Sequence, residues 1–86
     1  MKARFGKAFE KQYATLDKRI KSKFAQSLAA WMEDPYASVL NNHALRGKFK
    51  GYRSINVTGD FRAIYRLEGN DTGIFVAIGK HSHLYE

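Results

Sequence analysis

The sequence has 86 residues, enough for one small domain with a single hydrophobic core, and 15 Lys and Arg against 8 Asp and Glu give a net charge of +7. This charge favours nucleic acid or an acidic protein as the partner. The lack of cysteine excludes disulfides and thiolate metal sites, and the lack of a signal peptide or of a run of about 18 apolar residues favours a soluble, cytoplasmic protein.

The first part of the chain is predicted to be helical, apart from a short candidate edge strand at residues 2–5. From residue 6 to residue 15, the spacing of Phe9, Tyr13 and Leu16 by four and three predicts a helix with one buried face. Asp17 is a candidate N-cap for a second helix, which ends before Pro35 because proline disfavours helical geometry in the preceding residue. The apolar stripe of this second helix is predicted to lie in the core: Ile20, Phe24, Leu28, Trp31 and Met32.

Residues 36–50 are predicted to form a loop, with a short helical turn near residues 38–42. Beyond this loop the hydrophobic period changes to two, which predicts strands at residues 52–57, 61–67 and 74–78. Turns that contain Gly, Asp and Asn separate these strands, so consecutive strands should pair as antiparallel hairpins.

Alternation along the second of these strands places its side chains on opposite faces of the sheet. The predicted core face carries Phe61, Ala63, Tyr65 and Leu67, and the opposite face carries Arg62, Ile64 and Arg66. The predicted fold class is therefore α+β, with two N-terminal helices packed on one face of a small twisted antiparallel β-sheet. The other face is expected to present its cations to solvent, within a single domain over residues 1–86.

Four short motifs follow one another in the second half of the chain. They are Leu45-x-Gly47, Lys50-Gly51-Tyr52-Arg53, Gly59-Asp60-Phe61-Arg62-Ala63-Ile64-Tyr65 and Gly79-Lys80-His81-x-x-Leu84-Tyr85. This ordered set resembles the RelE/ParE superfamily of bacterial toxins, and most closely the YafQ-like and RelE-like mRNA interferases of type II toxin–antitoxin systems. The resemblance covers Leu45 to Tyr85, about half the chain, while the helical half agrees only in pattern.

The resemblance implies a RelE-like α+β fold and a metal-independent, cofactor-free endoribonuclease that cleaves mRNA in the ribosomal A site. It also implies neutralisation by a cognate antitoxin protein. Cleavage of RNA without a metal requires a base for the ribose 2′-OH, an acid for the leaving 5′-oxygen and a cation for the phosphorane. Histidine suits both proton transfers because its unperturbed pKa lies near the working pH, and the planar donors of arginine grip two phosphate oxygens together.

Five residues match functional positions of the family and are the candidate catalytic residues. His81 is a candidate general acid or base just past the third strand, and Arg62 matches the arginine that stabilises the phosphate in RelE-type members. Tyr85 matches a C-terminal aromatic that stacks on a base or assists proton transfer, although it could equally anchor the tail. His43 and Asp60 match a histidine and an aspartate of YafQ-type toxins, although His43 could cap its loop and Asp60 could be an ordinary turn residue.

Further basic residues are the candidate contacts to RNA phosphates: Lys48, Lys50, Arg53, Arg66 and Lys80. The chain also departs from the family patterns. YafQ-type members carry a histidine where this chain has Asn56 and an acidic residue where it has Ser54, and RelE-type members carry an arginine at the position of His81. The division of acid and base roles among His43, Asp60 and His81 therefore stays open.

Two other functions are compatible with the sequence. A toxin of the ParE type, or another non-catalytic binding module, would share the fold but block DNA gyrase or a different partner without cutting RNA. A small metalloprotein could use His43, Asp60, His81 and His83, because alternate histidines can chelate a metal ion. Arg62, His43 and Tyr85 together favour the nuclease.

Overall fold

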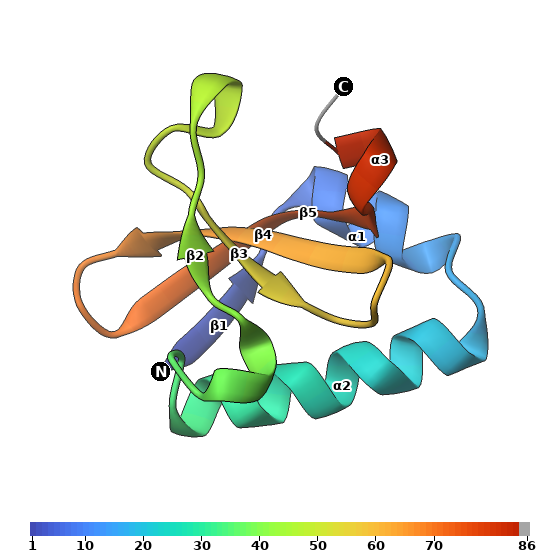
Figure 1. The fold of residues 1–86 in the computed structure, drawn as a ribbon, viewed down its shortest axis with the longest axis horizontal. Coiled ribbons are helices and arrows are strands. Elements are labelled where there is room, and N and C mark those ends of the chain that lie inside the picture. The colour runs from blue at the N-terminus through green and yellow to red at the C-terminus, as the bar shows by residue number, and fades with distance from the viewer. Residues whose placement is uncertain (85–86) are drawn as a thin grey trace.

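The chain forms a five-stranded sheet, with two helices between its first and second strands in sequence order and a short helix after its last strand (Figure 1). The computed structural model describes residues 1–84. Its elements are β1 (Lys2–Phe5), α1 (Lys7–Ala14), α2 (Lys18–Glu33), β2 (His43–Ala44), β3 (Arg53–Asn56), β4 (Phe61–Glu68), β5 (Thr72–Lys80) and α3 (His81–Leu84). Short 3₁₀ turns occur at Ser38–Leu40 and Gly47–Phe49. None of the helices within residues 1–84 is long and apolar enough to cross a membrane.

The strand order is β1-β5-β4-β3-β2, and the sheet is mixed. The pairs β2–β3, β3–β4 and β4–β5 are antiparallel, as the hairpin turns predict, but β1 lies parallel to β5. The prediction of a purely antiparallel sheet is therefore wrong. Hairpin turns fix the direction of β3, β4 and β5 only, whereas β1 leaves the sheet through a helix and its direction is free of that constraint.

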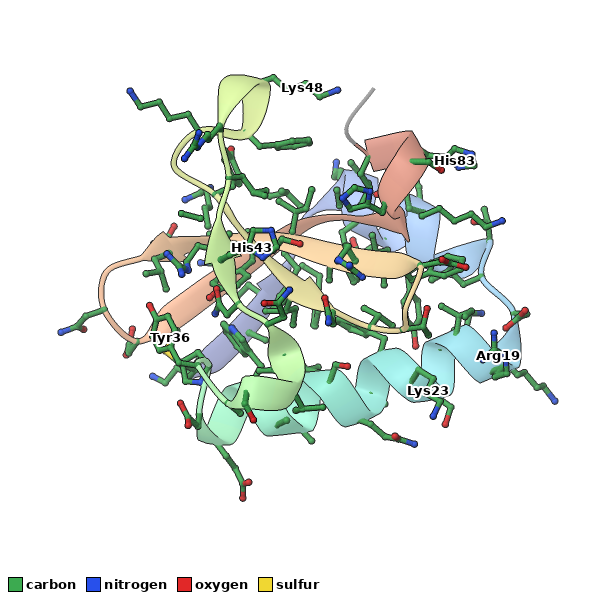
Figure 2. All side chains as sticks on the ribbon, in the orientation of Figure 1. Arg19, Lys23, Tyr36, His43, Lys48 and His83 are labelled. Atoms are coloured by element: carbon green, nitrogen blue, oxygen red, sulfur yellow. The ribbon has the colours of Figure 1, made fainter. Side chains whose placement is uncertain are left out.

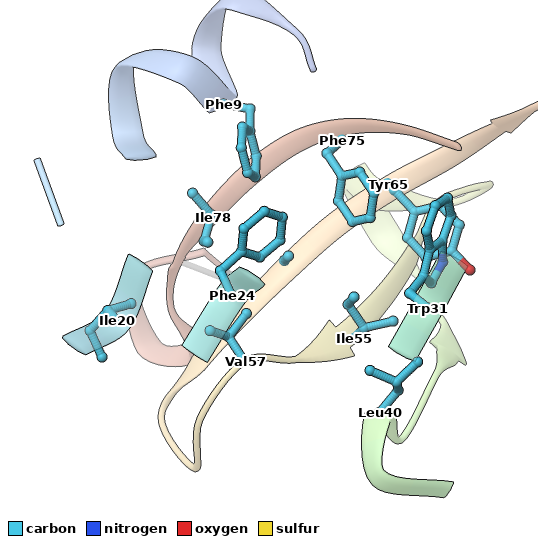
Figure 3. Close-up of a cluster of buried hydrophobic side chains, with 11 residues drawn as sticks. Phe9, Ile20, Phe24, Trp31, Leu40, Ile55, Val57, Tyr65, Phe75 and Ile78 are labelled. Atoms are coloured by element: carbon cyan, nitrogen blue, oxygen red, sulfur yellow. The ribbon is translucent and has the colours of Figure 1, made fainter. Parts of the chain in front are cut away.

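The principal core lies between the two N-terminal helices and one face of the sheet (Figure 3). Asp17 begins α2 as predicted, because its Oδ1 accepts a hydrogen bond from the Ile20 backbone amide at 2.9 Å. Trp31, near the other end of α2, is fully buried, and its ring lies 5.2 Å from the Tyr65 ring and 5.0 Å from the Phe75 ring. Met32, which we predicted to be buried, is instead exposed beside it.

A second, smaller core covers part of the opposite face of the sheet. Ile64, Ala77 and Leu84 are buried there, and the partly buried side chains packed on them are Leu45, Phe49, Tyr52 and Val76. The expectation of an open cationic face is thus only partly correct, because α3 and residues 45–52 fold over its apolar centre. Leu67, predicted on the core face, is exposed near the end of β4.

Candidate functional site

Several predicted functional residues share the face of the sheet that is turned away from the principal core, which we call the site face. His43 on β2 pairs with Ser54 on β3, Ser54 pairs with Ile64 on β4, and Ile64 belongs to the second core. Directly paired residues of antiparallel strands point to the same side, and alternation adds the residues two positions along. Arg62 and its β3 partner Asn56 therefore lie on the site face together with His43.

Asp60, Lys80 and His81 come together where β5 ends, beside the site face. Lys80 itself pairs with Phe61, so its side chain points to the side of the sheet opposite Arg62. The backbone N–H of His81 donates to the Asp60 carbonyl oxygen at 2.7 Å, which fixes the start of α3 against the turn before β4. A shallow pocket of about 350 Å³ is lined by Asp60, Lys80, His81 and Ser82. Arg62 pairs with Gly79, two residues before His81, so the arginine lies beside this pocket. The structure therefore brings together three of the predicted catalytic residues and one predicted phosphate contact.

The Arg62 side chain is half-buried and bound to the turn that precedes its own strand. Its Nη1 donates to the carbonyl oxygens of Thr58 at 3.1 Å, Gly59 at 3.2 Å and Phe61 at 3.4 Å. Within residues 1–84, every hydrogen bond of this guanidinium starts from Nη1. The donors on Nε and Nη2 are thus available to an anion above the site face.

His43 is exposed, and its ring is oriented by the backbone of its own loop. Its Nδ1 lies 2.9 Å from the carbonyl oxygen of Asn41. Because a carbonyl oxygen only accepts hydrogen bonds, Nδ1 must carry the proton, and in the neutral ring Nε2 then holds a lone pair. The arrangement gives His43 the form of a proton acceptor.

Arg62 lies between the two histidines on the site face. His43 is two strands from Arg62, or about 10 Å across the sheet, and about 7 Å along the strand direction. His81 follows the β5 partner of Arg62 on the other side. Within residues 1–84 no group of three or more His, Asp or Glu side chains is placed to hold a metal ion, so the four residues considered for a metalloprotein do not form such a site.

The predicted phosphate contacts are distributed unevenly. Lys48 and Lys50 are exposed on residues 45–52, the segment that projects from the sheet in Figure 2, and Lys80 lines the pocket beside His81. Arg66 lies on the site face, but its Nη1 is 4.0 Å from Glu68.

Arg53 lies away from the site face, on the same side of β3 as the buried Ile55. Its Nε donates to Asn42 Oδ1 at 2.7 Å, and its guanidinium lies 5.3 Å from the Tyr36 ring centroid. Tyr85, the remaining candidate, is outside the described residues.

Two polar groups of the site face entered the sequence analysis only as departures from a family pattern. Ser54 is fully buried and Asn56 is half-buried, and within residues 1–84 neither Ser54 Oγ nor Asn56 Oδ1 has a hydrogen-bond partner. Ser54 and Asn56 are two residues apart on β3, so strand alternation places both side chains on the same face of the sheet. The pairing of Asn56 with Arg62 makes that face the site face. The sequence analysis assigned no role to Asn42, because a loop sequence does not show which distant side chains its residues contact.

The chain is similar to known bacterial toxins over its whole length. A family model described as bacterial toxin of type II toxin–antitoxin system, YafQ, matches residues 1–86. The crystal structure of YafQ from E. coli strain BL21(DE3) is 24% identical with a TM-score of 0.82, covering 98% of this chain and 97% of that chain. A YoeB/ParE toxin from Agrobacterium tumefaciens is 22% identical with a TM-score of 0.78, covering 94% and 99%.

A solved complex is also similar. The E. coli DinJ–YafQ toxin–antitoxin complex contains a chain that is 25% identical with a TM-score of 0.75, covering 98% of this chain and 96% of that chain. No curated protein matches the sequence.

Proposed function

Because the chain belongs to the YafQ family of bacterial toxins of type II toxin–antitoxin systems, we propose that it is an endoribonuclease that cleaves mRNA, and that it does so in the ribosomal A site without a metal ion. The observation that carries this proposal is the position of Arg62 between His43 and His81 on one face of the sheet. This order matches what phosphodiester cleavage needs, a cation at the phosphate and a proton-transfer group on each side of it.

In the proposed reaction the scissile phosphate binds above Arg62. The Nε2 lone pair of His43 accepts the proton of the ribose 2′-OH, and the 2′-oxygen attacks phosphorus. The free donors of Arg62 stabilise the phosphorane. Protonated His81 then gives its proton to the leaving 5′-oxygen, which produces a 2′,3′-cyclic phosphate end and a 5′-hydroxyl end.

The first test is whether the protein cuts translated message. Induced expression without antitoxin should arrest growth and stop translation, and primer extension should reveal new 5′ ends within coding regions. Cutting of free RNA should persist in EDTA, because the proposed proton transfers and charge stabilisation come from side chains.

The competing function, gyrase inhibition, makes the opposite prediction for the same cells. It would produce double-strand breaks and a strong SOS response while message stays intact. That outcome would replace the nuclease with a ParE-type activity, and loss of cutting in EDTA would contradict a metal-independent reaction.

We further propose that an acidic segment of the cognate antitoxin binds the cationic surface around Arg62, as the net charge of +7 favours. Support for such a partner comes from the solved complex in which a similar toxin chain is held by DinJ. Affinity should fall on raising the salt from about 0.05 M to about 0.5 M, since exposed charge pairs are screened, while apolar contacts persist. Titration calorimetry with the product of the neighbouring gene measures this, and an absence of binding at low salt would contradict it.

A further inference from the structure

We propose that Asn42 is a positioning residue, which holds the Asn41 carbonyl against the His43 ring and thereby keeps the His43 proton on Nδ1. Only the expected effect on cleavage rests on the proposed function. The position of the His43 proton can be measured on the protein without RNA.

All the polar groups of the Asn42 side chain are engaged by other segments of the chain. Its Nδ2 donates to the Pro35 carbonyl oxygen and to the Tyr65 hydroxyl, each at 2.7 Å. Its Oδ1 accepts from Arg53 Nε at 2.7 Å. The three partners come from the segment after α2, from β4 and from β3, and the Tyr65 side chain is itself buried in the principal core. Asn42 is therefore fixed against the rigid centre of the molecule.

The peptide group between residues 41 and 42 transmits this constraint to His43. The carbonyl that meets His43 Nδ1 belongs to Asn41 but lies in the same plane as the Asn42 amide, so fixing Asn42 fixes its orientation. Asn41 adopts a left-handed conformation, with φ 45° and ψ 49°, which asparagine tolerates better than most residues. The two adjacent asparagines thus aim one carbonyl oxygen at the imidazole.

The local secondary structure alone offers little support for His43. Strand β2 has only two residues, both exposed, and lies at the edge of the sheet. Because only His43 and Ala44 pair with β3, strand pairing does little to fix the backbone before His43. Hydrogen bonds from Asn42 to three segments supply that constraint.

The hydrogen bonds of Asn42 also account for the position of Arg53 away from the site face. The Arg53 guanidinium donates to the Asn42 side chain and lies over the Tyr36 ring. A basic residue that sequence reasoning assigns to RNA therefore acts, in this proposal, on the far side of the sheet from the RNA.

Loss of the three hydrogen bonds of the Asn42 side chain should change the tautomer of His43. If the 41–42 peptide turns away, Nδ1 loses its acceptor, and the imidazole can carry its proton on Nε2 instead. The lone pair would then move to Nδ1, next to the backbone, and the exposed Nε2 would no longer accept a proton from substrate.

The test is the ¹⁵N NMR spectrum of the imidazole of His43 above neutral pH, because the two ring nitrogens have distinct shifts when protonated and unprotonated. We expect the Nδ1–H tautomer in the wild type and a clear shift towards Nε2–H in Asn42→Ala. Asn42→Asp keeps an acceptor for Arg53 but loses both donors, and should shift in the same direction. Asn70→Ala, an exposed asparagine in the β4–β5 turn, is the matched control and should leave the tautomer unchanged.

Cleavage provides the second measurement. Asn42→Asp should lower the rate at saturating message by about 10- to 100-fold with little change in KM, because the base is misplaced rather than the substrate. Wild-type Nε2–H, or retention of Nδ1–H in either Asn42 variant, would overturn the proposal. If the Asn42 variants change the tautomer of His43 but the wild type does not cut RNA, this inference is supported and the nuclease function is rejected.

Discussion

Replacement of Arg62 or of His81 with alanine is expected to slow cleavage of a translated message by about 100-fold or more in each case. In the proposed reaction, Arg62→Ala removes the cation that would face the developing charge of the phosphorane. His81→Ala removes the proposed proton donor to the leaving oxygen, beside the pocket that Asp60 also lines. Primer extension over a time course, with equal amounts of each protein, measures the two rates.

Two control variants separate chemistry from structure. Ser82→Ala changes an exposed residue that lines the same pocket and should cut at the wild-type rate. Arg62→Lys keeps the charge but loses the planar set of donors, and should recover only part of the activity. Arg62→Ala also loses the bonds to the turn at residues 58–61, so thermal melting must show that it remains folded. Wild-type cutting by His81→Ala would remove His81 from the mechanism.

Replacement of Gly73 with alanine is expected to destabilise the protein by about 3 kcal/mol, near the upper end for overpacking in a core. A Cβ at this position would lie 2.5 Å from Trp31 Cζ2, 2.6 Å from Trp31 Cη2 and 3.1 Å from Tyr65 Cδ2. The indole cannot move aside easily, because it is fully buried and packs edge-on against both the Tyr65 and the Phe75 rings. Urea unfolding of the two proteins measures the difference in the free energy of unfolding.

The matched control is Gly59→Ala, because a Cβ at Gly59 meets nothing within 4 Å and its backbone is not left-handed. Its stability should be equal to or slightly above that of the wild type. In a double-mutant cycle, Trp31→Phe should relieve part of the effect of Gly73→Ala, since the smaller ring leaves room for the methyl group. Equal stability of Gly73→Ala and the wild type would contradict this account of the Trp31 packing.

The sequence predicted the local elements well, because each has a strong local signal. Asp17 begins α2, the periodic residues of α2 reach the core apart from Met32, and the hairpin turns pair β3, β4 and β5 as expected. The family resemblance, which rested on motifs in half of the chain, is confirmed by the family model over residues 1–86.

The errors arose where distant segments meet. The covering of Ile64 by Leu84 depends on α3, a helix too short to have a periodic signal. The parallel pairing of β1 depends on contact with a strand near the other end of the chain. The position of Arg53 could have been predicted from the sequence, because strand alternation places it on the same side of β3 as the apolar Ile55.

Among the candidate catalytic residues, geometry added what sequence could not give. The adjacency of Asp60 and His81 comes from a hydrogen bond between a turn and the start of α3. The protonation of His43 on Nδ1 depends on a backbone carbonyl, and no side-chain pattern encodes the direction of a carbonyl.

The pairing of β1 with β5 has a consequence for the order in which the protein is made and folded. Synthesis proceeds from the N-terminus, so β1 emerges well before its hydrogen-bonding partner β5, which begins only at Thr72. Until then Phe5 and Phe9 lack the Phe75 ring that they contact in the finished molecule. Closing so long a loop slows folding, and the nascent chain exposes aromatic side chains in the meantime. His81 directly follows β5, so the nascent toxin gains its complete sheet and all the described residues of its candidate site only after β5 has been translated.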